Sequence, residues 1–194
     1  LIVSLSCNGF LLYKVLGSTT SNTSTNSNAK IETVNYDVKT DLTKVIASAK
    51  ESTVGVAVYQ GNKLSGSGSG VIYKTDGKTV YIITNHHVID GAQSIEVIYS
   101  NGKSVKANLI GSDKYGDIAV LKMTVDFDVK AFKTGDSELL EAGEPVLAVG
   151  SPLGIEYAGT VTQGIVSAPK RTVSVELNND GKEDWDMNVI QTDA

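Results

Sequence analysis

Short segments rich in β-branched residues, separated by turn dipeptides, recur along the middle of this 194-residue sequence. β-Branched and aromatic side chains favour strands, and Gly-Asn, Asp-Gly and Asn-Gly pairs favour tight reversals between strands. The sequence therefore predicts an all-β fold, with six short antiparallel strands that close into a small barrel. The predicted strands are residues 53–60, 67–73, 79–85, 95–99, 104–111 and 117–123, and the turn dipeptides are residues 61–62, 76–77, 90–91 and 101–102.

A second and smaller group of strands is predicted after a polar connection of residues 126–143, in which residues 135–140 suggest one turn of helix. These strands are residues 144–150, 157–167 and 188–192. The polar, acidic residues 171–187 predict a long loop, with or without a hairpin inside it. Because three strands leave unpaired edges, we expect the second unit to be incomplete. A short helix, residues 41–50 with Thr40 or Asp41 as N-cap, is predicted before the first strand.

Composition excludes several classes of function. The net charge is −5, and acidic and basic residues are interspersed, so nucleic acid is not an expected partner. The only cysteine is Cys7, which excludes an internal disulfide framework and a cysteine-rich metal site.

Residues 1–16 are mostly apolar, and residues 17–35 form a Ser/Thr/Asn-rich segment with little to bury. The apolar stretch is shorter than the about 20 residues that span a bilayer. Three interpretations fit it: the end of a transmembrane anchor with Lys14 at the interface, a signal-peptide core, or a buried helix. We take the first as our prediction, with residues 17–35 as a disordered linker that holds a domain of residues 36–194 away from a membrane.

Candidate catalytic residues follow a predicted buried strand. His86 and His87 are the only histidines, and they come directly after the apolar run that ends the third segment. Asp117 opens the sixth segment. A histidine and an aspartate on neighbouring strand ends form a general base and the carboxylate that orients it. A structural histidine and a turn aspartate are the simpler alternatives. A metal site is disfavoured, because adjacent residues on a strand point to opposite faces.

Two other motifs have structural explanations. The alternating glycines of residues 66–70 precede another strand, whereas a phosphate-binding loop must open a helix. We expect these glycines to allow close strand packing. No Gly-x-Ser-x-Gly elbow occurs in the sequence, so Ser67, Ser69 and Ser151 are not expected to be nucleophiles.

Six stretches together resemble the HtrA/Deg serine proteases, in family order from about Thr53 to Ala194. They are residues 66–72 (Gly-Ser-Gly-Ser-Gly-Val-Ile), 83–89 (Ile-Thr-Asn-His-His-Val-Ile), 117–122 (Asp-Ile-Ala-Val-Leu-Lys), 149–154 (Val-Gly-Ser-Pro-Leu-Gly), 164–167 (Gly-Ile-Val-Ser) and 190–194 (Ile-Gln-Thr-Asp-Ala). The resemblance implies a chymotrypsin-like double β-barrel, the first barrel complete over residues 53–125 and the second truncated over residues 144–194. It aligns His87 with the catalytic histidine and Asp117 with the catalytic aspartate, and it places His86 at a variable position.

The same resemblance implies a serine endopeptidase of protein quality control and the stress response, which cleaves unfolded or misfolded proteins through an acyl-enzyme. The membrane-anchored members of the family act outside the cytoplasm, assemble as homotrimers and need no metal or organic cofactor. Family members pack an aromatic residue in the trimer contact at the position of Tyr36, which could equally be an ordinary tyrosine. Residues 171–187 correspond to the loop that senses activating ligands in the family.

The family's nucleophile lies in a Gly-Asn-Ser-Gly-Gly motif beyond the sequence Gln-Thr-Asp-Ala, so residues 1–194 alone are expected to be inactive. The rival hypothesis is a non-catalytic protein, either a pseudoprotease or a β-barrel binding module at the cell surface. The presence of both His87 and Asp117 favours the enzyme, because neither residue is needed to close a barrel.

Overall fold

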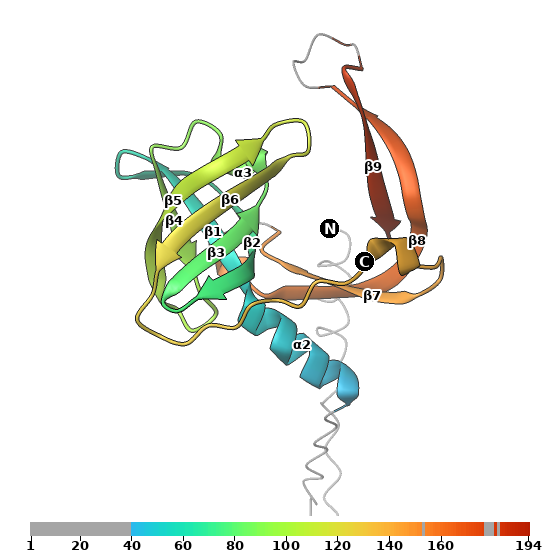
Figure 1. Ribbon diagram of the computed structural model, residues 1–194, viewed down its shortest axis with the longest axis horizontal. Helices are drawn as coiled ribbons and strands as arrows, with labels where there is room; N and C mark the ends of the chain where they lie inside the picture. The colour runs from blue at the N-terminus through green and yellow to red at the C-terminus, as the bar shows by residue number, and fades with distance from the viewer. Residues whose placement is uncertain (1–39, 153, 177–180, 182) are drawn as a thin grey trace, which may run out of the picture. The chain divides into compact units, whose positions relative to one another are not determined.

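The computed structural model describes residues 40–194, except for residues 153, 177–180 and 182 (Figure 1). The predicted membrane anchor of residues 1–16, the linker of residues 17–35 and Tyr36 lie outside the described residues. Within the described part, no helix combines the length and the apolar composition that crossing a bilayer would require.

The first described element is helix α2, Asp41–Ser52, which confirms the predicted helix and extends it by two residues. Thr40 is the N-cap, and its side chain accepts a hydrogen bond from the backbone N–H of Thr43 at 3.4 Å. Such a cap satisfies one of the backbone donors that the first turn of a helix leaves free. The helix runs directly into the first strand, whose first residue, Thr53, donates its backbone N–H to the carbonyl of Lys50.

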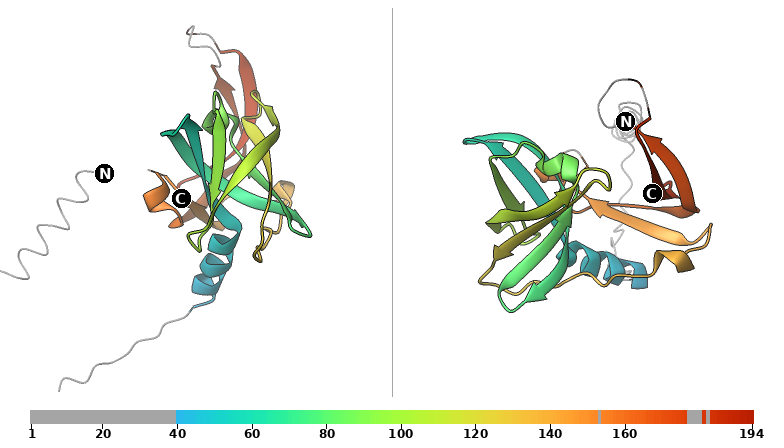
Figure 2. Two further views of the ribbon diagram at one scale, coloured as in Figure 1. Left: turned by 90° about the vertical axis from the view of Figure 1, so that its left-hand side faces the viewer. Right: turned by 45° about the horizontal axis from the view of Figure 1, so that its top comes forward.

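Six antiparallel strands form a closed barrel, as predicted, in the order β1-β2-β3-β6-β5-β4. Figures 1 and 2 show the strands wrapped around a common interior. The glycine of each of the four predicted turn dipeptides lies between two elements and has a positive φ. The strands are β1 (Thr53–Gln60), β2 (Lys63–Asp76), β3 (Thr79–Thr84), β4 (Ser94–Ile98), β5 (Ser104–Asp113) and β6 (Ile118–Thr124).

The barrel core is built by alternate residues of these strands. In β3, Val80 and Ile82 are fully buried, while their neighbours are half-buried. In β6, Ala119 and Leu121 point into the same interior. Burying a side chain such as Ile82 or Leu121 contributes about 1.5–3 kcal/mol. The period of two in the sequence therefore places one face of each strand in the core and leaves the strand ends for function.

Glycines of β2 allow two close approaches. A Cβ on Gly70 would lie 2.8 Å from a methyl group of Ile82, and a Cβ on Gly68 would lie 2.6 Å from a methyl group of Val88. Gly70 thus makes room for the core, and Gly68 for the segment that follows β3. The packing role expected for the alternating glycines is confirmed at these two positions.

A three-stranded antiparallel sheet, in the order β7-β8-β9, follows the barrel. The strands are β7 (Pro145–Gly150), β8 (Thr160–Val175) and β9 (Trp185–Thr192), and two short 3₁₀ helices, Ser137–Leu139 and Ile155–Tyr157, flank β7. The first part of β8 pairs with β7, and its second part pairs with β9. Register shifts between Val166 and Arg171, a stretch that includes Pro169, interrupt the pairing of β8 with β9. Proline lacks a backbone N–H and is tolerated at such irregularities.

Residues 171–187 contain a hairpin, the alternative that the sequence left open beside a long loop. The end of β8 and the start of β9 lie in this range, with residues 176–184 between them. Figure 1 and the right-hand view of Figure 2 show that the ribbon of this hairpin extends beside the barrel and is not one of its staves.

Strand β7 contacts β1 and β2 of the barrel. At this contact the backbone N–H of Ser151 donates a hydrogen bond of 2.8 Å to the Oγ of Ser69 on β2. The described residues are thus mostly strand, with a closed barrel and a partial second sheet. The predicted fold class, an all-β protein with the double-barrel arrangement, is confirmed.

Candidate active site

The two histidines lie on one turn of helix, α3 (His86–Ile89), directly after β3. The sequence placed them directly after the predicted strand of residues 79–85, but it did not predict the helical turn that holds them. Asn85 keeps an extended backbone as the N-cap, after which the chain turns, and Ile89 is buried at 5% exposure in the barrel core. The buried Ile89 and the close packing of Val88 on Gly68 fix the turn that carries His87.

Asp117 ends the short connection between β5 and β6. In this connection the carboxylate of Asp113 accepts hydrogen bonds from the backbone N–H groups of Tyr115 and Gly116, each at 3.1 Å. Asp117 itself has a φ of +50°, the only positive value at a described residue other than glycine. Aspartate tolerates a left-handed backbone better than most residues, but the conformation is still uncommon and persists where the surroundings hold it. The sequence predicted Asp117 as the first residue of the sixth strand. In the structure this strand, β6, begins one residue later, at Ile118.

The structure brings His87 and Asp117 together, as the resemblance implied. The Nδ1 atom of His87 lies 2.7 Å from Oδ2 of Asp117, and the backbone N–H of His87 donates to Oδ1 of Asp117 at 2.9 Å. An ionised carboxylate only accepts hydrogen bonds, so the proton of a neutral His87 ring resides on Nδ1. Its Nε2 atom is then an acceptor. The side chain of His87 is 70% exposed, which leaves this acceptor accessible from solvent.

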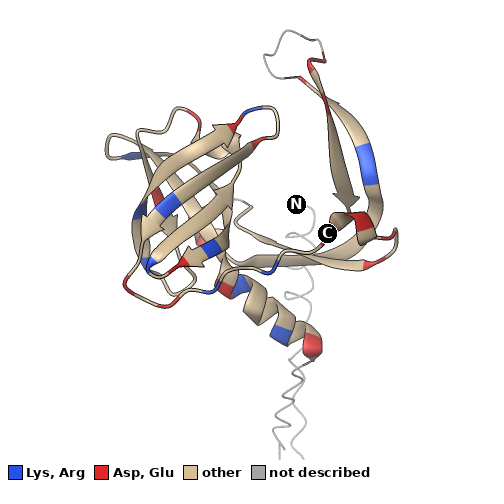
Figure 3. Cartoon of the chain, viewed as in Figure 1, with Lys and Arg blue, Asp and Glu red and all other residues tan. Residues whose placement is uncertain are grey.

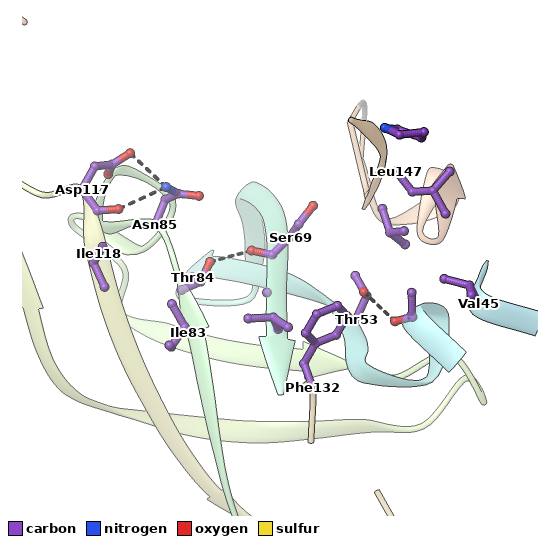
Figure 4. A pocket seen from close by; sticks show the side chains of 15 residues that line it. Val45, Thr53, Ser69, Ile83, Thr84, Asn85, Asp117, Ile118, Phe132 and Leu147 are labelled. Atoms are coloured by element: carbon purple, nitrogen blue, oxygen red, sulfur yellow. Dashed lines mark hydrogen bonds between the residues drawn. The ribbon is translucent and has the colours of Figure 1, made fainter. Parts of the chain in front are cut away.

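Asn85 is a site residue that the sequence reasoning did not single out. Its side-chain NH₂ donates to Oδ2 of Asp117 and to the backbone carbonyl of Asp117, each at 3.1 Å, as Figure 4 shows. The signal in the sequence is an asparagine between a buried strand and a histidine pair, where a cap residue is expected. Instead of capping α3, its side chain holds the backbone of Asp117.

The hydrogen bonds to Asp117 stabilise its ionised form. Partial burial alone would raise the pKa of the Asp117 carboxyl, but the bonds from the His87 backbone, the His87 ring and Asn85 together hold the pKa below its usual value. Asp117 is therefore a carboxylate at neutral pH, able to orient His87 and to stabilise an imidazolium when the ring takes up a proton.

The ring of His86 has a different partner. Its Nδ1 atom lies 3.1 Å from the Oγ of Ser112 on β5. Among the described residues, the His86 ring thus contacts a serine hydroxyl of β5, whereas the His87 ring contacts the carboxylate of Asp117. Within the described residues, no group of three or more histidine, cysteine, aspartate or glutamate side chains is arranged to hold a metal ion.

An apolar hollow of about 650 Å³ lies beside the pair, between the barrel, α2 and β7. Asn85 and Asp117 stand at one end, and Phe132 and Leu147 lie among its apolar walls, as Figure 4 shows. On β2, Ser69 also borders it, but its Oγ is engaged with the N–H of Ser151. Lysines, arginines, aspartates and glutamates are mixed over the barrel in Figure 3.

Comparison with known proteins identifies the family. Residues 68–194 match the family described as the trypsin-like peptidase domain. The chain belongs to this family. Within it, the chain is of the HtrA type, as its relatives show.

Three relatives illustrate the similarity. The serine protease Do-like HtrA of Lactococcus lactis subsp. cremoris is 40% identical over 198 residues, which cover 89% of this chain and 48% of that protein. The serine protease HtrA-like of Staphylococcus aureus is 46% identical over 128 residues, 66% of this chain and 17% of that protein. A solved structure of a variant of the HtrA-type protease AlgW with a tripeptide gives a TM-score of 0.64 at 32% identity, and covers 80% of this chain and 46% of that one. The chain thus spans about half the length of the Lactococcus relative.

Proposed function

We propose that the protein is a serine endopeptidase in which His87 is the general base and then the general acid, and Asp117 orients it. The observation that carries this proposal is the 2.7 Å contact between Nδ1 of His87 and Oδ2 of Asp117, with the opposite side of the ring exposed. In this arrangement Nε2 accepts the proton of a serine hydroxyl as it attacks a peptide carbonyl. The same nitrogen then gives the proton to the leaving amine.

The mechanism forms an acyl-enzyme, which a water molecule hydrolyses with His87 again acting as base. The nucleophile is the serine of the family's Gly-Asn-Ser-Gly-Gly motif, which does not occur within residues 1–194. The names of the relatives support the proteolytic activity, and the tripeptide in the AlgW structure supports a peptide as ligand.

We further propose that the substrates are unfolded or misfolded proteins and that the enzyme serves protein quality control outside the cytoplasm. The support for this location is the sequence alone, an apolar stretch of residues 1–16 followed by the polar residues 17–35. A homotrimer held at the membrane by this stretch is the assembly that the family resemblance favours.

The test uses the protein expressed from its complete gene, with an unfolded protein as substrate and a fluorophosphonate probe for an activated serine. We expect His87→Ala to lower cleavage about 10⁴-fold or more and to abolish probe labelling, because the base is lost. The matched control is His86→Ala, which removes the neighbouring ring and should leave most of the activity.

Two results would contradict the proposal. Cleavage that survives His87→Ala would show that this ring is not the base. A wild-type protein that neither cleaves nor reacts with the probe would support the rival hypothesis of a non-catalytic module.

A further inference from the structure

A ring contact joins the β8–β9 hairpin to the connection that carries Asp117. The centroids of Tyr115 and Trp185 lie 5.6 Å apart, and the ring planes make an angle of 61°. Tyr115 belongs to the β5–β6 connection, and Trp185 is the first residue of β9. Each residue is about half-exposed, so the contact lies at the surface of the protein. Figure 1 shows this connection on the side of the barrel nearest the hairpin.

The connection between Tyr115 and Asp117 is short and tightly bonded. Asp113, at the end of β5, accepts hydrogen bonds from Tyr115 and Gly116 with its two carboxylate oxygens. A Cβ on Gly116 would lie 2.9 Å from one of these oxygens, so the chain passes closely over the carboxylate. Because little slack remains over these residues, a displacement of Tyr115 is transmitted to Asp117, two residues further along.

The uncommon left-handed backbone of Asp117 is held by several contacts. Two supports come from the barrel: Asn85 holds the carbonyl and carboxylate of Asp117, and His87 binds the carboxylate. The ring of Trp185 adds a third support through Tyr115, and this one comes from outside the barrel.

We propose that Tyr115 and Trp185 are positioning residues for Asp117. Their contact favours the geometry of the connection in which Asp117 accepts the Nδ1 proton of His87. The position of the β8–β9 hairpin therefore sets the fraction of molecules in which the His87–Asp117 hydrogen bond is formed. The consequence for catalysis rests on the proposed function, whereas the effect on the hydrogen bond does not.

The test follows the Nδ1 proton of His87 by NMR in protein labelled with ¹⁵N-histidine. Residues 1–194 contain two histidine rings, and His86 provides an internal reference beside Ser112. We expect Tyr115→Ala and Trp185→Ala each to move the His87 Nδ1 proton signal upfield and to speed its exchange with water roughly two- to tenfold, the range expected for an aromatic pair. Tyr115→Phe and Trp185→Phe keep a ring at each position and should preserve the signal. The double alanine variant should add little to either single change.

Trp185 also offers an optical check, because it is the only tryptophan of the chain. Its fluorescence should shift to the red in Tyr115→Ala, since the indole ring loses its cover. Matched controls are Tyr73→Ala, an equally exposed tyrosine on β2, and Ile190→Ala, an exposed apolar residue of the same strand β9.

Several outcomes overturn the proposal. An unchanged His87 signal in both alanine variants would reduce the contact to surface packing, and so would an equal change in Ile190→Ala. If an alanine variant does not fold, the phenylalanine variant at the same position takes its place. Because that variant keeps a ring, a changed His87 signal in it would count against the proposal. If the His87 signal responds as expected, but the protein expressed from its complete gene cleaves no substrate, the proposed function is refuted and this inference stands.

Discussion

Both carboxylate oxygens of Asp117 are engaged by the segment that carries His87. The ring binds one oxygen at 2.7 Å, and the backbone N–H of the same residue binds the other at 2.9 Å. One side chain thereby fixes the tautomer of the ring and the placement of the first turn of α3. A substitution of Asp117 should therefore change both the protonation of the His87 ring and the position of that ring.

We expect Asp117→Asn to lower the rate of cleavage about 10⁴-fold, with a smaller effect on substrate binding. An asparagine that donates its NH₂ to Nδ1 stabilises the tautomer with its proton on Nε2, which cannot act as a base. The measurement is the kcat and KM for an unfolded substrate, with Asp90→Asn as the charge-matched control just after α3. Equal losses in the two variants would argue for a general effect of charge.

The lowered pKa of Asp117 also predicts a dependence of stability on pH. A carboxyl with a depressed pKa in the folded state stabilises the fold above its unfolded pKa, and this contribution is lost as the pH falls through the folded value. In Asp117→Asn, acid unfolding should therefore be less steep in the range below the ordinary pKa of aspartate, 3.8. Urea unfolding at a series of acid pH values measures the difference between the two proteins.

Helix α3 is placed by close packing on β2. Gly68→Ala would put a Cβ 2.6 Å from one methyl group of Val88 and 3.0 Å from the other. We expect a loss of about 1–3 kcal/mol in the free energy of unfolding, together with lower activity, because α3 has to move with His87. Chemical denaturation and cleavage assays measure the two effects.

Two variants separate this clash from the general cost of a substitution. Gly111→Ala on β5 adds a Cβ in open space and should be nearly neutral. The double variant Gly68→Ala with Val88→Ala removes the clashing methyl groups and should regain activity relative to Gly68→Ala. If the single variant is as active as the wild type, the packing of Val88 does not position His87.

The elements that the sequence predicted well are those with local signals. The barrel strands alternate buried and exposed residues, and their turns carry glycine where a positive φ is needed. Helix α3 was missed because its four residues, His86–Ile89, are too few to show a helical period. The pairing of His87 with Asp117 came from the family resemblance, since residue spacing alone cannot show a contact between the segment after one strand and the connection before another.

The β8–β9 hairpin was left open by the sequence for a different reason. Most of its residues are exposed or half-exposed, so the period-two pattern of apolar residues is weak. Polar cross-strand pairs contribute to its pairing, including Ser174 Oγ with Asp186 Oδ1 at 2.8 Å and Thr172 Oγ1 with Asn188 Oδ1 at 3.0 Å. The contacts of Asn85 and Trp185 depend on tertiary structure, and neither could be inferred from nearby sequence.

At the scale of the molecule, the barrel core predicts sensitivity to alkaline pH. Tyr99 is 5% exposed, its hydroxyl donates to the sulfur of Met123 at 3.2 Å, and burial raises its pKa to about 12. Because this pKa is raised, the stabilisation is complete below the unfolded value, 10.0, and is lost as the pH rises through the folded value.

We expect the free energy of unfolding to fall by up to about 2–3 kcal/mol between pH 10 and 12, which corresponds to the shift of the Tyr99 pKa. Tyr99→Phe should remove most of this dependence, whereas Tyr73→Phe, at an exposed position, should not. Urea unfolding across this pH range provides the measurement. An equal alkaline loss in Tyr99→Phe would assign it to other groups.

The barrel and the second sheet are joined where Ser69 meets Ser151. The Oγ of Ser69 accepts a hydrogen bond from the backbone N–H of Ser151. Ser151 is only 7% exposed. A Cβ on the neighbouring Gly150 would lie 2.8 Å from the Oγ of Ser69. Ser69→Ala leaves a buried N–H without its acceptor, at a cost of about 1–3 kcal/mol. We therefore expect faster amide exchange at Ser151 and along β7, while the barrel strands keep their protection.

Ser151→Ala provides the matched control, because it retains the backbone N–H that Ser69 binds. The Oγ of Ser151 is buried, and it has no hydrogen-bond partner among the described residues. Its removal should therefore be neutral or slightly stabilising, and the exchange of β7 should not change. If Ser69→Ala and Ser151→Ala loosen β7 equally, side-chain packing joins the two sheets. If only Ser69→Ala does so, the hydrogen bond between Ser69 and Ser151 joins them, and β2 then supports β7 as well as the turn that carries His87.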